Sequence, residues 1–131
     1  MNDQILAALQ NRAVDNQIAC ADAHEVAELL GVSPLEVSRV INRASSLRVN
    51  RCQLGLFGYG PKEEGKHKIV SLAAHVPEDI EMAIREKVIN GRISCADIWE
   101  IAGRYKYPRL GIANIIEALE IKVKPCQLGC F

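Results

Sequence analysis

The amino-acid sequence predicts a mainly helical fold with short β segments, built as two tandem copies of one helix-turn-helix unit. Three observations support this prediction. The chain of 131 residues repeats two of its own segments, apolar residues recur at helical spacing within each copy, and breaks that contain glycine or proline separate the helices. A chain of this length holds one domain or two very small ones.

Internal repetition is the clearest of these features. Residues 18–27 reappear as residues 93–102 with six of ten positions identical, and residues 52–57 reappear as residues 126–131 with five of six identical. The offset is 75 residues for the first segment and 74 for the second. Repetition on this scale indicates a repeated structural unit.

The repeat divides the chain into two units and a connecting segment. We place the first unit at residues 1–58 and the second, divergent helix-turn-helix-like unit at residues 77–131. Residues 59–76 between them are rich in glycine and charge, which is typical of a linker or of a wing hairpin. For a wing, residues 69–72 supply the returning strand.

Local patterns predict the elements of the first unit in order. Apolar spacing favours a first helix over residues 3–14 and a second over residues 21–30, with a short strand at residues 17–19 between them. Gly31 ends the second helix, because glycine readily takes a positive φ. Residues 47–51 alternate as a strand does and fit the first strand of a wing, so short β wings complete the predicted fold class.

The start of the third helix is the sharpest local signal in the chain. Ser33 is a preferred N-cap, Pro34 suits the first helical position, and Glu36 completes a capping box three residues after the serine. Two short helices joined at residues 31–33 form a helix-turn-helix. The side chains expected in the core are Val37, Val40, Ile41 and Ala44.

Residues 22–42 resemble the helix-turn-helix of lactose-repressor-type regulators. The resemblance is carried by Val26-Ala27, by Gly31-Val32-Ser33 and above all by Val37-Ser38-Arg39-Val40-Ile41-Asn42. In that family the motif opens the protein and a sugar-binding domain follows, whereas here a predicted helix and strand come first, as in a winged-helix unit. The resemblance implies descent from the helix-turn-helix and winged-helix DNA-binding superfamily.

The outward face of the third helix predicts a surface that reads double-stranded DNA. Arginine pairs with guanine, asparagine pairs with adenine, and an apolar side chain can contact a thymine methyl group. Residues 39–51 contain four arginines and no acidic residue, which places positive charge where phosphates would lie. The predicted nucleic-acid-binding residues are Ser33, Leu35, Ser38, Arg39, Asn42, Arg43, Arg48 and Arg51.

The matching segment of the second unit, residues 107–120, is less suited to DNA. It lacks the serine cap and exposes Arg109, Asn114, Glu117 and Glu120, and the two glutamates would repel phosphate. We therefore interpret the second unit as a structural copy, or as one that binds a protein partner or a second copy of the chain.

Five cysteines raise a separate question of metal or redox chemistry. An odd number, with most inside the repeated motifs, favours reduced thiols that pack as small apolar residues. Without CxxC or HxxxH spacing no metal site is predicted, and a cysteine-based metal or redox sensor stays an alternative. The weak metal candidates are Cys20, Cys52, Cys95, Cys126 and Cys130.

Composition limits the remaining function classes. Sixteen basic and sixteen acidic residues cancel, so any basic surface must be local. The start of the chain lacks a signal-like pattern and no apolar stretch approaches the ~20 residues of a membrane span, which predicts a cytoplasmic protein without membrane contact.

The leading prediction is a small DNA-binding or transcription-regulatory protein that uses the helix-turn-helix of its first unit. A protein-protein interaction adaptor on the same scaffold is the alternative. No nucleophile elbow, Walker loop or paired catalytic carboxylates are present, so we expect neither an enzyme nor a cofactor.

Overall fold

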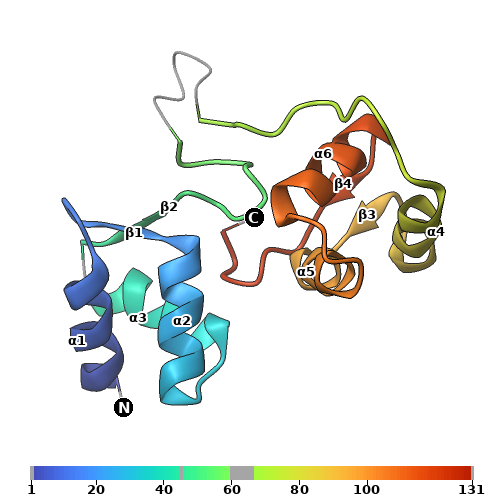
Figure 1. Ribbon diagram of the computed structural model, residues 1–131. Coiled ribbons are helices and arrows are strands. Elements are labelled where there is room, and N and C mark those ends of the chain that lie inside the picture. Colours follow the sequence, from blue (N-terminus) through green and yellow to red (C-terminus); the bar gives the residue numbers. More distant parts are fainter. Residues whose placement is uncertain (1, 45, 60–66, 131) are drawn as a thin grey trace. The chain divides into compact units, whose positions relative to one another are not determined.

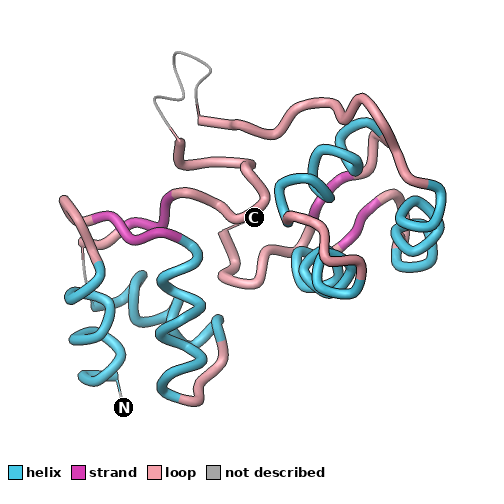
Figure 2. Tube along the Cα trace, viewed as in Figure 1, coloured by secondary structure: helices cyan, strands magenta, loops and turns pink. Residues whose placement is uncertain are grey.

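The chain is mainly helical with a few short strands, which confirms the mainly α class (Figure 1). The structure is a computed structural model that describes residues 2–44, 46–59 and 67–130. Internal contacts divide the chain into two compact units, residues 1–68 and 69–131. Each unit contains its own helices and its own pair of strands, as the tube in Figure 2 shows.

The first unit packs three helices together. These are α1 (Asn2–Arg12), α2 (Cys20–Leu30) and α3 (Pro34–Ala44), and each contacts the other two. Burial of their apolar stripes supplies the main stabilisation, since an isolated helix of this length is marginal in water. The buried side chains on these helices include Ile5, Leu9, Ala23, Val26, Ala27, Val37, Val40 and Ile41.

A parallel strand pair completes the first unit. Strand β1 (Gln17–Ala19) pairs with β2 (Arg48–Asn50), and Ile18 lies opposite Val49. The pairing joins segments that lie far apart in the sequence. A side-chain hydrogen bond reinforces it, because Asn50 Nδ2 donates to Gln17 Oε1 at 2.8 Å.

The described residues do not form the predicted wing hairpin. A wing is an antiparallel hairpin, yet β2 pairs in parallel with β1, and residues 69–72 form no strand within the described part of the chain. Burial explains the difference. Leu47 and Ile18 are both buried, so pairing β2 with β1 keeps apolar side chains in the core. A returning strand at residues 69–72 would gain little, since Leu72 is 70% exposed.

The first helix ends two residues earlier than predicted because a tight turn follows it. Val14 and Gln17 exchange two backbone hydrogen bonds of 2.9 Å, and the residues between them, Asp15 and Asn16, take φ values of 51° and 61°. Aspartate and asparagine tolerate this left-handed conformation better than most residues. The turn points the chain into β1.

The second unit has the same order of elements. Helix α4 (Glu78–Lys87), strand β3 (Arg92–Ile93), helices α5 (Cys95–Arg104) and α6 (Arg109–Ala118), and strand β4 (Lys122–Val123) follow one another. The two strands again pair in parallel. The buried side chains on these elements include Ile80, Ile84, Ile93, Ile98, Ile101, Ile112, Ile115 and Ile116. No helix in the described ranges is long and apolar enough to cross a membrane.

The Cys-Gln-Leu-Gly motif forms the same turn after the last strand of each unit. The Cys52 carbonyl accepts from Gly55 N at 2.9 Å, and the Cys126 carbonyl accepts from Gly129 N at 3.1 Å. In each turn the cysteine sulfur also accepts the leucine N–H at 3.4 Å. The two leucines are fully buried (Leu54 and Leu128), so the motif anchors each turn by burying its leucine.

Candidate nucleic-acid interface

A short turn joins α2 and α3 of the first unit, and a defined helix end lies on each side of it. Helix α2 ends at Gly31, whose φ is 67° and whose N–H donates to the carbonyls of Ala27 and Glu28. Helix α3 then begins with its predicted N-cap, because Ser33 Oγ accepts from Glu36 N at 3.2 Å. Both ends satisfy backbone groups that a helix terminus leaves unpaired. The orientation of α3 therefore depends on these contacts.

Replacing Ser33 by alanine is expected to lower the free energy of unfolding by about 1 kcal/mol, because an N-terminal N–H of α3 loses its acceptor. Urea unfolding followed by circular dichroism measures this change. Ser46→Ala, at an exposed position outside the helix, is the control and should change stability by less than about 0.5 kcal/mol. Equal effects of the two variants would show that the cap contributes nothing.

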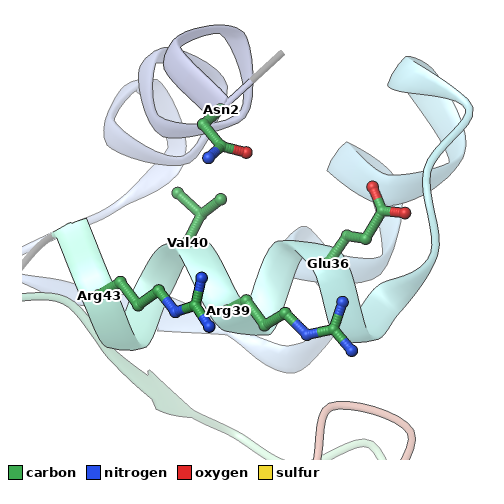
Figure 3. A pocket seen from close by; sticks show the side chains of 5 residues that line it. All are labelled: Asn2, Glu36, Arg39, Val40 and Arg43. Carbon is green, nitrogen blue, oxygen red and sulfur yellow. The ribbon is translucent and has the colours of Figure 1, made fainter.

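Most predicted base-reading side chains of α3 lie on its outer face. Arg39, Asn42 and Arg43 are exposed, Leu35 is 49% exposed, and Ser38 is half-buried. In Figure 3 the two arginine side chains run along the same side of the helix, whereas Val40 points toward α1. The amphipathic pattern thus separates a core face from an arginine-bearing face.

The charges of this face are not neutralised inside the unit. Arg39 and Arg43 have no ion-pair partner among residues 2–44, 46–59 and 67–130. By contrast, Arg12 on α1 pairs with Glu25 and lies 3.8 Å from Asp22. The two guanidinium groups of α3 therefore remain available to an external anion.

A shallow pocket lies along the same face. Its volume is about 280 Å³, and it is lined by Asn2, Glu36, Arg39, Val40 and Arg43. Glu36 is the acidic member of this lining, and it marks the N-terminal end of the positive surface. Negative charge in the first turn of a helix also complements the helix dipole. The helix dipole alone therefore explains a glutamate at position 36, and no ligand is needed to explain it.

The remaining predicted arginines lie on the strand side of the first unit. Arg48 is exposed on β2 and its Nη1 donates to the Leu47 carbonyl at 3.0 Å. Arg51 follows β2 with a φ of 46°, and its N–H donates to the Gly58 carbonyl at 3.3 Å. Arg48 and Arg51 thus lie on and just after β2, whereas Arg39 and Arg43 lie on α3.

Helix α6 of the second unit presents a different surface. With the offset of 75 residues, Asn114 stands where the first unit has Arg39, and Ala118 stands where it has Arg43. Asn114 Oδ1 accepts from Ser71 N at 2.9 Å, and the Asn114 carbonyl accepts from Ala73 N at 3.1 Å. The outer face of α6 therefore holds the unit's own leading segment.

Arg109 differs from its predicted exposed state. It is half-buried, and its guanidinium lies 3.5 Å from the centre of the Trp99 ring, a close cation–π contact. This stacking is worth roughly 0.5–2 kcal/mol and keeps the arginine against α5. The Asn114 contacts and the Trp99 stack were missed in the sequence, because both depend on residues far apart in the chain.

The cysteines split into buried and exposed sites. Cys20, Cys52, Cys95 and Cys126 are buried, Cys130 is exposed, and none of the five is in a disulfide. Within the described residues no group of three or more His, Cys, Asp or Glu side chains is placed to hold a metal ion. Burial suits the predicted packing role of the four inner cysteines.

Comparison of the chain with models of known protein families, with characterised proteins and with solved structures found no match.

Proposed function

We propose that the protein binds double-stranded DNA through α3 of its first unit and acts as a small regulatory protein. The observation that carries the proposal is the exposed, unneutralised pair Arg39 and Arg43 on a capped helix of a helix-turn-helix. We also propose that the two units are diverged copies of one helix-turn-helix-like fold. The second unit is then a structural or partner-binding copy. The shared order of elements and the parallel strand pairs support that relationship.

Each side chain of the α3 face has a chemical role in this proposal. Arg39 and Asn42 would read base edges, and Leu35 would contact a thymine methyl group. Arg43 contacts phosphate. Polar and basic groups nearby would fix the register by contacts to the DNA backbone, which carry no sequence information. The side chains expected to contact the DNA backbone in this way are Ser33, Ser38, Arg48 and Arg51.

By the same reasoning, the second unit is poorly suited to reading DNA. At the position of Asn42 it has Glu117, and its Arg43 position is Ala118. A carboxylate facing phosphate is repelled, and an alanine supplies no charge. Asn114 is already engaged by backbone N–H groups of residues 71 and 73. This division of labour supports the proposal that only one helix of the chain reads DNA.

The test is binding of random-sequence duplex DNA across a salt series, comparing the parent protein with Arg39→Ala/Arg43→Ala. Each lost contact should cost roughly 1–3 kcal/mol if it reads a base and less if it touches only phosphate. The double variant should therefore bind at least roughly tenfold more weakly. The slope of log affinity against log salt should also fall by about 1–2, because fewer counterions are released.

The matched control is Arg85→Ala/Arg104→Ala, which removes the same charge from the second unit. These arginines lie 3.4 Å from Glu81 and 3.8 Å from Glu100, so their charges are already offset and DNA affinity should change little. Equal losses in both double variants would indicate a diffuse charge effect rather than a reading helix.

A protein-protein interaction adaptor is the second candidate, and exposed apolar side chains favour it. Leu29 is 69% exposed at the end of α2, and Leu35 is 49% exposed at the start of α3. Absence of DNA binding even at low salt would overturn the first proposal and leave this one. Under the adaptor reading, Leu35→Ser would weaken a protein complex while Arg39→Ala would not.

A further inference from the structure

The turn between α5 and α6 of the second unit alternates basic and aromatic side chains. Residues 104–109 read Arg-Tyr-Lys-Tyr-Pro-Arg, and no acidic residue occurs from position 101 to position 116. The chain has one tryptophan, three tyrosines and two phenylalanines, and three of these six, Trp99, Tyr105 and Tyr107, lie within nine residues of each other. Positive charge next to aromatic rings is typical of surfaces that bind nucleic acid.

The matching turn of the first unit has the same backbone hydrogen bonds. The N–H of Gly31 donates to the carbonyl three residues earlier at 3.3 Å, and the N–H of Lys106 does the same at 3.3 Å. The residue after each donates to the carbonyl five residues earlier, at 3.0 Å in the first unit and 2.9 Å in the second. Residues 29–34 of the first unit nevertheless read Leu-Leu-Gly-Val-Ser-Pro. The fold of the turn therefore requires neither basic nor aromatic side chains.

Lys106 takes a backbone conformation that the first unit gives to a glycine. Its φ is 53°, and the φ of Gly31 is 67°. A residue with a Cβ is strained in this left-handed region, whereas glycine is not. Lys106 is exposed and has no ion-pair partner in the described part of the chain, so no ion pair offsets that strain. The charge of the lysine is therefore available to an external anion.

Gly111 on α6 makes room for the Tyr107 ring. A Cβ added at Gly111 would lie 2.6 Å from Tyr107 Cε2 and 2.8 Å from Tyr107 Cδ2. The ring therefore packs directly on the backbone of α6, which restricts its motion. Tyr107 is only half-buried, so part of this restrained side chain still faces solvent. A restrained aromatic ring at the surface is suited to stacking with a nucleic-acid base.

Two cation–π contacts hold positive charge beside the rings. The Arg109 guanidinium lies 3.5 Å from the centre of the Trp99 ring, and the Arg104 guanidinium lies 5.4 Å from the centre of the Tyr105 ring. Arg104 also lies 3.8 Å from Glu100, which offsets its charge. Lys106 and Arg109 therefore supply most of the positive field of this turn.

Helix α6 favours a single strand over a duplex at this turn. Duplex DNA is read by a helix that enters the major groove. On α6, Asn114 is engaged by the backbone N–H of Ser71 and of Ala73, and Glu117 would repel phosphate. A single strand needs no helix in a groove, because its bases can stack on a ring while its phosphates contact a cation.

We propose that residues 104–109 bind a single-stranded nucleic acid, with a base stacked on Tyr107 and a phosphate bound by Lys106. Arg109 adds positive charge and restrains the Trp99 ring. This site is separate from α3 of the first unit, so the inference goes beyond the proposed binding of duplex DNA.

The experiment titrates the full chain with oligothymidylate of about 15 nucleotides, a length within the usual range of single-strand sites. The chain carries Arg39→Ala/Arg43→Ala, so that α3 contributes little. Trp99 is the single tryptophan of the chain and stacks on Arg109, so its fluorescence should change on binding. The single strand should bind at least roughly fivefold more tightly than the same strand paired with oligoadenylate, because paired bases cannot stack on a side chain. Oligouridylate of the same length shows whether RNA or DNA is preferred, and tight binding of either supports the proposal.

Variants of the turn separate stacking from charge. Tyr107→Ala should weaken binding at least roughly fivefold, and Tyr107→Phe should retain it, because a phenyl ring also stacks. Lys106→Gly should lower the slope of log affinity against log salt by about 0.7, because one phosphate contact is lost. It should not lower the unfolding temperature, since glycine accepts the positive φ. Lys122→Ala is the matched control, because it removes another exposed lysine of the second unit, on β4, and should leave affinity nearly unchanged.

Several results would overturn the proposal. These are absence of binding at low salt, equal affinity for the duplex, unchanged affinity in both Tyr107→Ala and Lys106→Gly, and an equal loss in Lys122→Ala. Competition by polyglutamate as strong as that by oligothymidylate would also overturn it and would indicate an acidic protein partner. Duplex binding by α3 is absent from this measurement, so the two proposals can fail separately.

Discussion

Replacing Leu9 by alanine is expected to lower the free energy of unfolding by about 2–5 kcal/mol. Leu9 is fully buried on α1, the helix that packs against both α2 and α3. The truncation removes apolar contacts and leaves a cavity that close-packed neighbours only partly fill. A unit of this size has only a few kcal/mol to about 10 kcal/mol of stability in total. The variant is therefore expected to be partly unfolded in the first unit at moderate temperature.

Urea unfolding followed by circular dichroism measures this loss. Gln10→Ala is the control, because Gln10 is the exposed neighbour on the same helix and its change should stay within about 0.5 kcal/mol. DNA binding should weaken with the loss of folded first unit and recover at lower temperature. A cost below about 1 kcal/mol for Leu9→Ala would contradict the packing of α1 against α2 and α3.

Replacing Gly58 by alanine is the second large effect, with an expected cost of about 3 kcal/mol or more. The φ of Gly58 is 83°, and an added Cβ would lie 2.4 Å from Arg51 N and 2.7 Å from Asn50 Cα. Both contacts are with backbone, which cannot swing away as a side-chain end can. The loop must therefore open, and the hydrogen bond from Arg51 N to the Gly58 carbonyl is lost with it.

Gly31→Ala is the matched control for this prediction. Gly31 also has a positive φ, 67°, but an added Cβ meets no atom within 4 Å. Its cost should be the conformational strain alone, roughly 1–2 kcal/mol. Thermal unfolding of the two variants separates strain from collision. Similar costs would mean that the backbone of Gly58 does not lie close to β2.

Much of the fold of the first unit was predictable because its signals are local. Helical spacing, the Ser33 cap and the Gly31 stop each involve residues within one or two turns of each other, and the structure places all three as expected. The internal repeat in the sequence also indicated where a second set of elements would begin. The exposure of Arg39 and Arg43 follows from the same helical period.

Apart from the end of α1, the failures share one physical cause, since each depends on contacts between segments that lie apart in the sequence. A strand at residues 47–51 was expected, but the sequence does not indicate whether its partner strand comes before or after it. Burial of Leu47 and Ile18 decided in favour of β1 and against a wing. The end of α1 is a local exception: the Val14–Gln17 turn sets it, and the apolar spacing does not reveal that turn.

The sequence by itself determined the helices, their caps, the repeat and the four arginines of residues 39–51, because these depend on residue type and short-range spacing. Only the tertiary structure decided the parallel strand pairs, the hydrogen bonds of Asn114 with residues 71 and 73, and the stacking of Arg109 on Trp99. Those features need backbone and side-chain groups brought together by burial of the apolar core. The spacing of apolar residues predicts which face of a helix or strand is buried. Tertiary packing then determines which residues that face contacts.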